Sequence, residues 1–191
     1  YLANISYDLE KNEVGGLDLI FKVNEFDKVR VKKIMFLGNN KLEDAELKKF
    51  MQTKEESLFS GLSGSGSFKD FNFKTDIERL KYLYKTKGYL QVNVENPVVT
   101  VSEDKKWIFI TVKVTEGPQF SVNNIFYNGE LLFTEGEMKK KTTLKSGEIY
   151  SEESLRQDIQ ALTEMYQDKG YAFANVLRTL KIVPGENKVD I

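Results

Sequence analysis

The chain contains nearly the same phrase twice, as YKTKGYLQVNVE at residues 84–95 and as YQDKGYAFANVL at residues 166–177. At a constant spacing of 82 positions, Asp76, Ile77, Leu80, Tyr84, Lys87, Gly88 and Tyr89 return as Asp158, Ile159, Leu162, Tyr166, Lys169, Gly170 and Tyr171. Upstream of them, VKKIMFLGNNKL (31–42) resembles VNNIFYNGELLF (122–133), now 91 positions apart. The sequence is therefore built from two copies of one unit. The first copy has about nine additional residues within LFSGLSGSGSFKDFNF (58–73).

Each copy begins with a short strand that leads into a helix. Residues 31–37 form a β-rich run closed by Gly38, which predicts a strand followed by a turn. A first helix follows, with Leu47, Phe50 and Met51 expected on its apolar face. In the second copy Thr134 and Glu137 have the spacing of a capping box, which predicts that the helix begins there.

The second helix of each copy has the clearest periodicity. Apolar residues recur at i, i+4, i+7 and i+11, as Phe73, Ile77, Leu80 and Tyr84 and again as Leu155, Ile159, Leu162 and Tyr166. Both helices end on Lys-Gly, where glycine adopts the left-handed conformation and lysine complements the helix C-terminus. The repeated phrase thus marks the end of a helix and the start of a strand.

After Gly88 the sequence period changes from 3.6 to 2. Alternate residues are expected to point inward (Leu90, Val92 and Val94) and outward (Gln91, Asn93 and Glu95). Val99 and Val101 are out of phase with them, so a common inner face requires one extra residue, and we expect a β-bulge at Asn96 and Pro97. Because proline cannot donate to a β-ladder, this strand is expected at the edge of its sheet.

WIFITVKV (107–114) is the return strand, with its buried face formed by Ile108, Ile110, Val112 and Val114. Trp107 and Phe109 fall on the opposite face, where they form an exposed patch or pack against a neighbouring module or under a loop. Each unit thus has the order strand, helix, helix, strand, strand. This order favours an α+β fold with both helices on one face of a sheet.

The order and several motifs resemble the POTRA domain, the polypeptide-transport-associated module of outer-membrane assembly proteins. The resemblance covers the whole chain and is carried by KGY (87–89 and 169–171), IMFLGN (34–39) and VTEGP (114–118). It implies tandem β-α-α-β-β modules, each with a three-stranded mixed sheet and two antiparallel helices on one face. The long inter-helix loop of the first copy resembles that of the third POTRA of the insertase that assembles β-barrels.

The resemblance also implies a division of the chain. Residues 1–26 would be the C-terminal hairpin of a preceding, second POTRA; residues 27–117, the first repeat, a complete third one with its long loop; and residues 118–191, the second repeat, most of a fourth. The segment VNEFD (23–27), which leads out of this hairpin, lacks the glycine and proline found at 117 and 118, where the chain leaves the first repeat. The chain stops at Ile191, where the last strand of the second repeat should only be starting.

By this resemblance the chain is a binding scaffold in the periplasm of a Gram-negative cell, and it meets the membrane only through a barrel outside these residues. Its expected partners are unfolded outer-membrane proteins and accessory lipoproteins. An edge strand has unpaired backbone groups to which an extended client strand can add with little dependence on sequence. The expected binding residues are Leu90, Gln91, Val92, Asn93, Val94, Glu95, Pro97, Val99 and Val101. Two alternatives stay open: the bulge only protects the edge from aggregation, or the chain is the POTRA pair of a two-partner secretion transporter.

Composition argues against other classes of function. The 28 basic and 29 acidic residues form no long block of one sign, so nucleic acid is not an expected partner. Cysteine and histidine are both absent, which removes thiol nucleophiles, imidazole bases and the usual metal ligands. We therefore expect neither an enzyme nor a metal or other cofactor. No apolar run approaches the length of a membrane helix, about 20 residues.

Two further patterns have structural explanations. The loop SGLSGSGS (60–67) lacks the lysine of a phosphate-binding loop and does not follow a strand, so we interpret it as a surface loop. Phe59, Phe68, Phe71 and Phe73 flank it, and some of them are expected to fold onto the core. Glu152 and Glu153 do not face one another on a helix, and they lie where a helix N-terminus favours negative charge.

Overall fold

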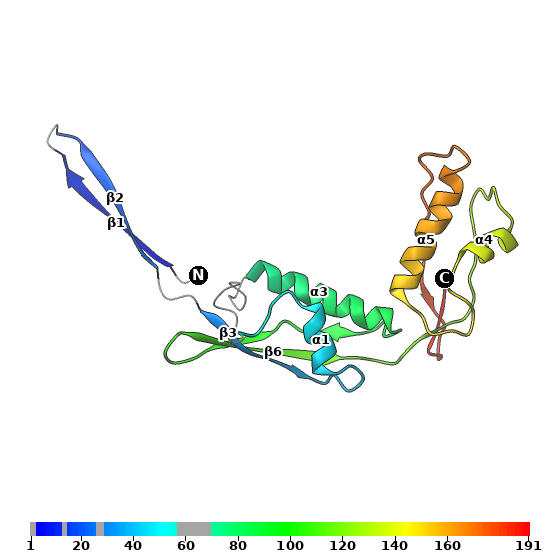
Figure 1. Ribbon diagram of the computed structural model, residues 1–191, viewed down its shortest axis with the longest axis horizontal. Helices are drawn as coiled ribbons and strands as arrows, with labels where there is room; N and C mark the ends of the chain where they lie inside the picture. Colours follow the sequence, from blue (N-terminus) through cyan, green and yellow to red (C-terminus); the bar gives the residue numbers. More distant parts are fainter. Residues whose placement is uncertain (1–2, 13–14, 26–28, 57–69) are drawn as a thin grey trace.

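The computed structural model describes residues 3–12, 15–25, 29–56 and 70–191 (Figure 1). A hairpin comes first, formed by β1 (Ala3–Lys11) and β2 (Leu17–Glu25). The first repeat contains β3 (Arg30–Leu37), α1 (Asp44–Phe50), α3 (Asp70–Thr86), β4 (Asn93–Val94), β5 (Val98–Val101) and β6 (Trp107–Thr115). The second contains β7 (Ser121–Val122), α4 (Glu135–Lys141), α5 (Glu152–Gln167), β8 (Lys181–Ile182) and β9 (Lys188–Asp190).

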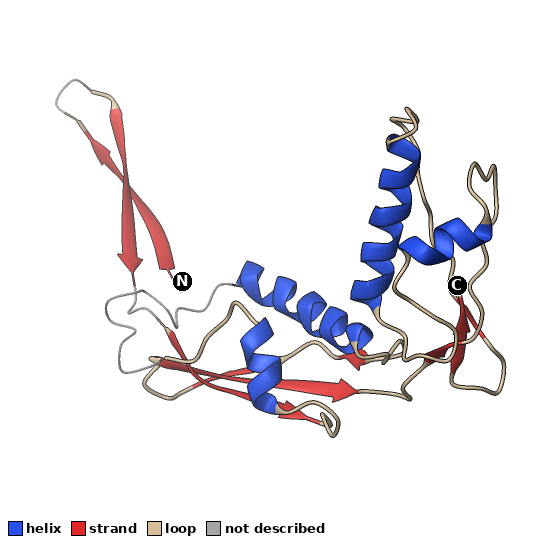
Figure 2. Cartoon of the chain, turned by 45° about the vertical axis from the view of Figure 1, so that its right-hand side comes forward, coloured by secondary structure: helices blue, strands red, loops and turns tan. Residues whose placement is uncertain are grey.

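The sheet of the first repeat is organised around β6. This strand pairs in parallel with β3 and antiparallel with β4 and β5, so the sheet is mixed and β6 is its centre. The buried residues of β6 are Ile108, Ile110, Val112 and Val114, as expected. They share one core cluster with Leu47 of α1 and Leu80 of α3, so both helices cover the same face (Figure 2). The predicted α+β architecture is confirmed.

The predicted helix features are also largely present. Phe73, Ile77, Leu80 and Tyr84 are all buried, and Gly88 ends α3 with a left-handed φ of 87°. Thr134 and Glu137 form the expected capping box. Phe50 is a wrong prediction, because it is exposed while Leu47 and Met51 fill the core. The loop 60–67 and Phe59 and Phe68 lie outside the described residues, as does the side chain of Phe71.

A buried aspartate joins the two helices of each repeat. Asp76 accepts hydrogen bonds from the backbone N–H groups of Gln52 and Thr53, which follow α1. Asp158 does the same for Thr143 and Leu144 after α4. These backbone donors lie past the helix end, where no ladder is available to satisfy them. The repeated aspartate therefore supplies acceptors to a buried turn.

The strand predicted at residues 90–101 is shorter and divided. Leu90, Gln91 and Val92 are not in it, because the chain turns after Gly88 and β4 begins at Asn93. The register then changes from Val94 opposite Val114 to Val98 opposite Thr111. One extra residue is thus accommodated between β4 and β5, and the predicted bulge is confirmed.

The second repeat has a much smaller sheet. The prediction of a strand directly after Gly170 is wrong, because the antiparallel partner of β9 is only Lys181–Ile182. β9 has three residues where β6 has nine, so the preceding segment has no neighbour with which to form a ladder. A cavity of about 1430 Å³ lies there, lined among others by Ile125, Leu162 and Tyr166. These residues are the counterparts of Ile34, Leu80 and Tyr84, which belong to the core that packs on β6.

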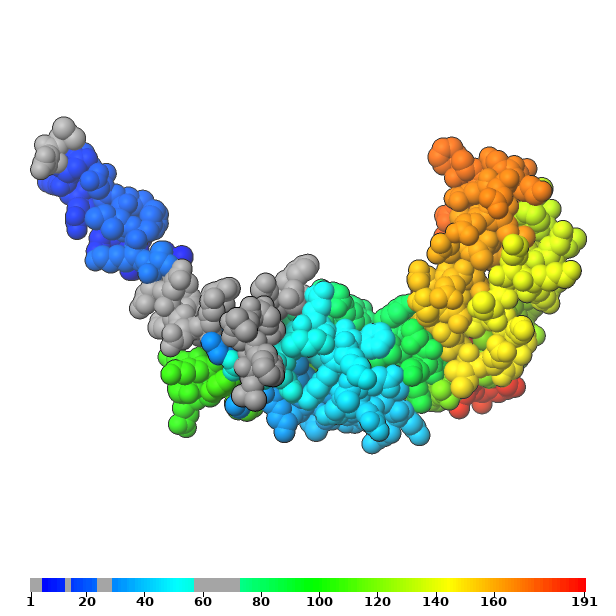
Figure 3. Space-filling view, in the orientation of Figure 1, coloured from blue at the N-terminus to red at the C-terminus, as the bar shows by residue number. Residues whose placement is uncertain are grey.

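The N-terminal hairpin stands clear of both repeats (Figure 3). In its register Tyr7 faces Phe21, Ile5 faces Val23 and Leu9 faces Leu19. All six side chains are exposed, and strand alternation places them on one face. None of the helices in the described part of the chain is both long and apolar enough to cross a membrane.

Candidate functional site: the outer edge of the first sheet

The outer edge of the first sheet is formed by β4 and β5. Ser102 N–H donates to the carbonyl of Trp107 at 2.9 Å, and Glu95 N–H donates to the carbonyl of Lys113 at 2.9 Å. Because inward and outward amides alternate along an antiparallel strand, Val98 and Thr100 also face β6. The backbone N–H and C=O groups of Val99 and Val101 therefore point away from the sheet.

These outward groups are unpaired among the residues that the structure describes. The side chains around them are also accessible, with exposed fractions of 62% for Val98, 39% for Val99 and 50% for Val101. Val99 and Val101 lie opposite the buried Ile110 and Ile108, so they are on the helix-covered face as predicted, but near its margin. The edge thus presents free backbone groups between apolar side chains.

The opposite edge, β3, is covered along its first half. Glu56 N–H donates to the carbonyl of Val31 at 2.8 Å, and the carboxylate of Glu55 accepts from Ile34 N–H at 2.8 Å. Burial alone would raise the pKa of Glu55, but the hydrogen bonds from Ile34 and Lys48 outweigh it and hold the pKa below its usual value. Glu55 is therefore a charged cap on this edge.

The predicted binding residues fall into two groups. Asn93, Val94, Glu95, Pro97, Val99 and Val101 lie on β4, β5 or the bulge between them. Leu90 instead packs against the core of the second repeat, and Val92 against that of the first. Gln91 lies beside Gly117 in the linker. The candidate edge is therefore residues 93–101.

Leu90 belongs to a junction that joins the two repeats. Phe120 N–H donates to the carbonyl of Gly88 at 2.8 Å, and the side-chain amide of Gln119 donates to the carbonyl of Lys87 at 2.8 Å. A Cβ on Gly88 would lie 2.8 Å from Ile149 of the second repeat. The turn that ends α3 is thus also a docking surface, which the sequence pattern did not reveal.

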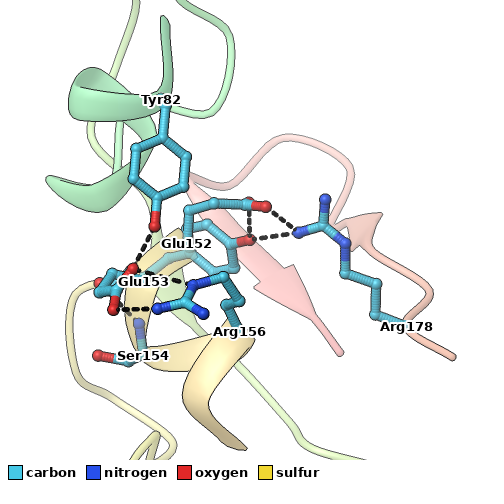
Figure 4. Close-up of polar contacts among 8 residues, drawn as sticks. Tyr82, Glu152, Glu153, Ser154, Arg156 and Arg178 are labelled. Atoms are coloured by element: carbon cyan, nitrogen blue, oxygen red, sulfur yellow. Dashed lines mark hydrogen bonds and ion pairs between the residues drawn. The ribbon is translucent and has the colours of Figure 1, made fainter. Parts of the chain in front are cut away.

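A polar cluster closes the junction between α3 and α5 (Figure 4). The hydroxyl of Tyr82 donates to Glu153, which also accepts from Arg156 at 2.8 Å. The hydrogen bonds from Arg156 and then Tyr82 lower the pKa of Glu153 to about 2. Glu152 pairs with Arg178 and accepts from Tyr150 at 2.6 Å. Each of the two adjacent carboxylates therefore has its own structural partners.

Trp107 and Phe109 lie on the face of the sheet opposite the helices, as predicted, and both are half-buried. The ammonium of Lys32 lies 4.3 Å from the centre of the Trp107 ring. Among the described residues there is no group of three or more acidic, histidine or cysteine side chains that could hold a metal ion.

Comparison with known sequences agrees with the repeat. The family model of POTRA, surface antigen variable number repeat, matches residues 29–117 and 120–191. An outer membrane protein assembly factor BamA from Nitratidesulfovibrio vulgaris is 27% identical over 196 residues, covering 100% of this chain and 24% of the relative. A putative outer membrane protein assembly factor of Treponema pallidum is 29% identical over 165 residues, covering 84% of this chain and 19% of that protein. The chain thus spans about a quarter or less of these relatives.

Solved structures show the same fold. A crystal structure of Haemophilus influenzae BamA POTRA3-5 matches with a TM-score of 0.62 and 18% identity, over 98% of this chain and 70% of that one. BamA from Haemophilus ducreyi lacking POTRA domains 1-3 matches with a TM-score of 0.64 and 15% identity, over 84% and 28%. Together with the family match over both repeats, these likenesses show that the chain belongs to the POTRA family.

Proposed function

We propose that this chain is a periplasmic binding scaffold of the outer-membrane protein assembly machinery, and that the edge at residues 93–101 binds extended polypeptide. Two relatives named as outer membrane protein assembly factors support the first part. Neither name describes an enzyme, and we propose a binding role without catalysis. In this proposal the chain reaches the membrane only through a barrel outside these residues.

The observation that carries the second part is the contrast between the two edges of one sheet. On β3 the carbonyl of Val31 is bound by Glu56 N–H, and the N–H of Ile34 is bound by the carboxylate of Glu55. On β5 the outward groups of Val99 and Val101 have no partner in the described part of the chain. A strand added to β5 would form main-chain hydrogen bonds that depend little on its side chains. Such binding suits both unfolded barrel proteins and accessory lipoproteins as partners.

We further propose that residues 1–26 are the closing hairpin of a preceding POTRA. The exposed apolar face of β1 and β2 supports this, because the equivalent face of the hairpin of β5 and β6 is the one that α3 covers in the first repeat. Residues 27–117 would then be a complete module, and residues 118–191 a module whose last strand is incomplete. The cavity beside β9 supports the latter assignment.

The test is an NMR titration of the labelled chain with a peptide copied from an outer-membrane barrel strand. We expect backbone shifts centred on residues 93–101. The variant Val99→Pro removes an outward N–H without removing a hydrogen bond to β6, so it should abolish these shifts while the rest of the spectrum is retained.

Val99→Ala is the matched control, because it loses the same side chain but keeps the amide. It should bind nearly as well as the natural chain. Equal binding by Val99→Pro and Val99→Ala would show that the backbone of this edge is not the contact. Shifts confined to the helices or to Trp107 and Phe109 would place recognition elsewhere.

A further inference from the structure

The face of the first sheet that the helices leave uncovered has an unusual local geometry in β3. Val31 pairs with Ile108, but the next pair is Lys33 with Phe109, so Lys32 is an extra residue in a β-bulge. Both lysines are exposed while Val31 and Ile34 on either side of them are buried. A bulge can place two consecutive side chains on one face. Here it brings Lys32 and Lys33 together beside the two aromatic rings of β6.

Apolar side chains continue this face away from the lysines. In the ladder register Met35 lies beside Thr111, which lies beside Val98 of β5. Leu37, one row farther along, is more than half exposed, as is Val98. No helix in the described part of the chain packs on these residues. The face is therefore a band of aromatic and aliphatic groups bounded by lysines.

Charge on this face is predominantly positive. Lys32 and Lys33 make no ion pair within the described residues, and Lys32 lies over the ring of Trp107. The carboxylates around this face have other partners. Glu55, whose pKa the charge of Lys33 helps to lower, pairs with Lys48 at 2.8 Å, Glu95 pairs with Lys113 at 2.9 Å, and Asp104 accepts from Ser102 and from Lys106 N–H. Ammonium groups beside an apolar band complement a surface that has both carboxylates and apolar side chains.

We propose that this face, formed by Lys32, Lys33, Met35, Trp107, Phe109 and Val98, binds an acidic amphipathic helix of a partner protein. A helix is the element that completes a sheet with an uncovered apolar face, as α1 and α3 do on the other side. Its apolar stripe would lie along β6 and its carboxylates beside Lys32 and Lys33. Both rings are half-buried, which favours a protein partner over insertion into a lipid surface. This site is separate from strand addition at β5.

Trp107 is the only tryptophan in the chain, so its fluorescence reports directly on this face. The probe is a helical peptide of about 16 residues with leucine at i, i+3, i+4 and i+7 and glutamate on the flanks of that stripe. We expect a saturable shift of the Trp107 emission to shorter wavelength. The same peptide with lysine in place of glutamate should give a much weaker effect.

Charge reversal tests the assignment of the lysines. The double variant Lys32→Glu and Lys33→Glu should weaken binding about tenfold. The matched control, Lys140→Glu with Lys141→Glu on α4, should leave it unchanged, as should Val99→Pro if the two sites are distinct. Equal binding of both peptides, or binding insensitive to the Lys32 and Lys33 changes, would overturn the proposal. A shift produced by phosphatidylglycerol vesicles but not by the acidic peptide would also overturn it in favour of a lipid surface.

Discussion

The two repeats have the same sequence pattern and yet different sheets. Their second helices share four identities, both helices are followed by a left-handed glycine, and each repeat has a buried aspartate that joins its helices. The first repeat has a central strand of nine residues, whereas the sequence printed for the second ends at Ile191, one residue after the three-residue β9. The comparison teaches that helices, caps and turns follow from the local sequence, whereas the outer strands exist only as far as the central strand extends beside them.

The largest difference in stability loss between equivalent substitutions in the two repeats is expected at a pair of equivalent glycines. A Cβ on Gly38 would lie 2.2 Å from the carbonyl oxygen of Val114, and its φ of 87° is also unfavourable for alanine. Gly129, its counterpart, has a φ of 113° and nothing within 4 Å. We expect Gly38→Ala to cost about 3–5 kcal/mol of stability. Gly129→Ala should cost only the backbone strain of about 1–2 kcal/mol.

Hydrogen exchange measured separately for the two repeats checks this prediction, because it assigns each loss to its own region. Trp107 fluorescence during urea unfolding gives a second measurement for the first repeat. Similar losses for the two variants would mean that the contact of β6 with the turn at Gly38 is not what distinguishes the repeats.

Equal effects are expected at the buried aspartates. Asp76→Ala and Asp158→Ala each leave two backbone N–H groups without their acceptor, next to the core. Each substitution should cost about 2–4 kcal/mol, seen as faster exchange in the repeat that carries it. Asp→Asn at either position keeps one acceptor and should cost less. A strong effect at Asp76 with none at Asp158 would show that the turn of the second repeat is not a packed element.

A smaller difference is expected between two equivalent tyrosines. Tyr84 is fully buried and its hydroxyl donates to Glu116 at 3.0 Å, while Glu116 also accepts from Asn40 and Lys41. Burial, and to a smaller extent the hydrogen bond to Glu116, raises the pKa of Tyr84 above its usual value. Tyr84→Phe should therefore cost about 1–2 kcal/mol in urea unfolding.

Tyr166 provides the control for that substitution. Within the described part of the chain its hydroxyl accepts one hydrogen bond, of 3.3 Å from Leu132 N–H, and the residue is half-buried. Tyr166→Phe should cost about 0.5 kcal/mol or less. A loss as large as that of Tyr84→Phe would indicate that the second repeat has a buried network of its own.

Features that depend on neighbouring residues could be predicted from the sequence, and features that depend on contacts between distant segments could not. The apolar face of α3, its Lys-Gly end and the bulge after Glu95 all follow from residues close together in the chain, and all are confirmed. The period of two predicts that Leu90 belongs to the strand. It leaves the strand because the left-handed Gly88 turns the chain and the second repeat offers an apolar site.

The protected edge of the first sheet had no signal in the sequence. Glu55 and Glu56 follow α1 without periodicity, and their binding to β3 depends on how the chain returns past that strand. The junction was missed for the same reason, since Tyr82 lies on the polar side of an amphipathic helix and its partner is Glu153 of the next repeat. Contacts between units leave no periodic pattern in either unit.

The smallest effect on stability is expected at the junction. Here the repeats differ in one polar contact, the hydrogen bond from Tyr82 to Glu153. The counterpart of Tyr82 is Glu164, which accepts from Gln160 of its own helix. In the folded chain the pKa of Glu153 is about 2, against about 4.3 for an unperturbed glutamate. The folded pKa is the lower one, so the hydrogen bonds that Glu153 accepts from Arg156 and Tyr82 together stabilise the chain at pH above about 4.3, and this contribution is lost as the pH falls towards 2.

Carboxyl-carbon NMR of Glu153 measures that titration directly. Arg156→Gln should raise its pKa most, because the guanidinium has the largest effect, and Tyr82→Phe should raise it less. Because Tyr82 is the one member of this cluster from α3, the change on Tyr82→Phe also reports whether the repeats are in contact in solution. If that substitution leaves the Glu153 pKa unchanged while Arg156→Gln raises it, α3 and α5 are not held together by this hydrogen bond, and the contacts of Gly88, Leu90 and Phe120 are what join the repeats.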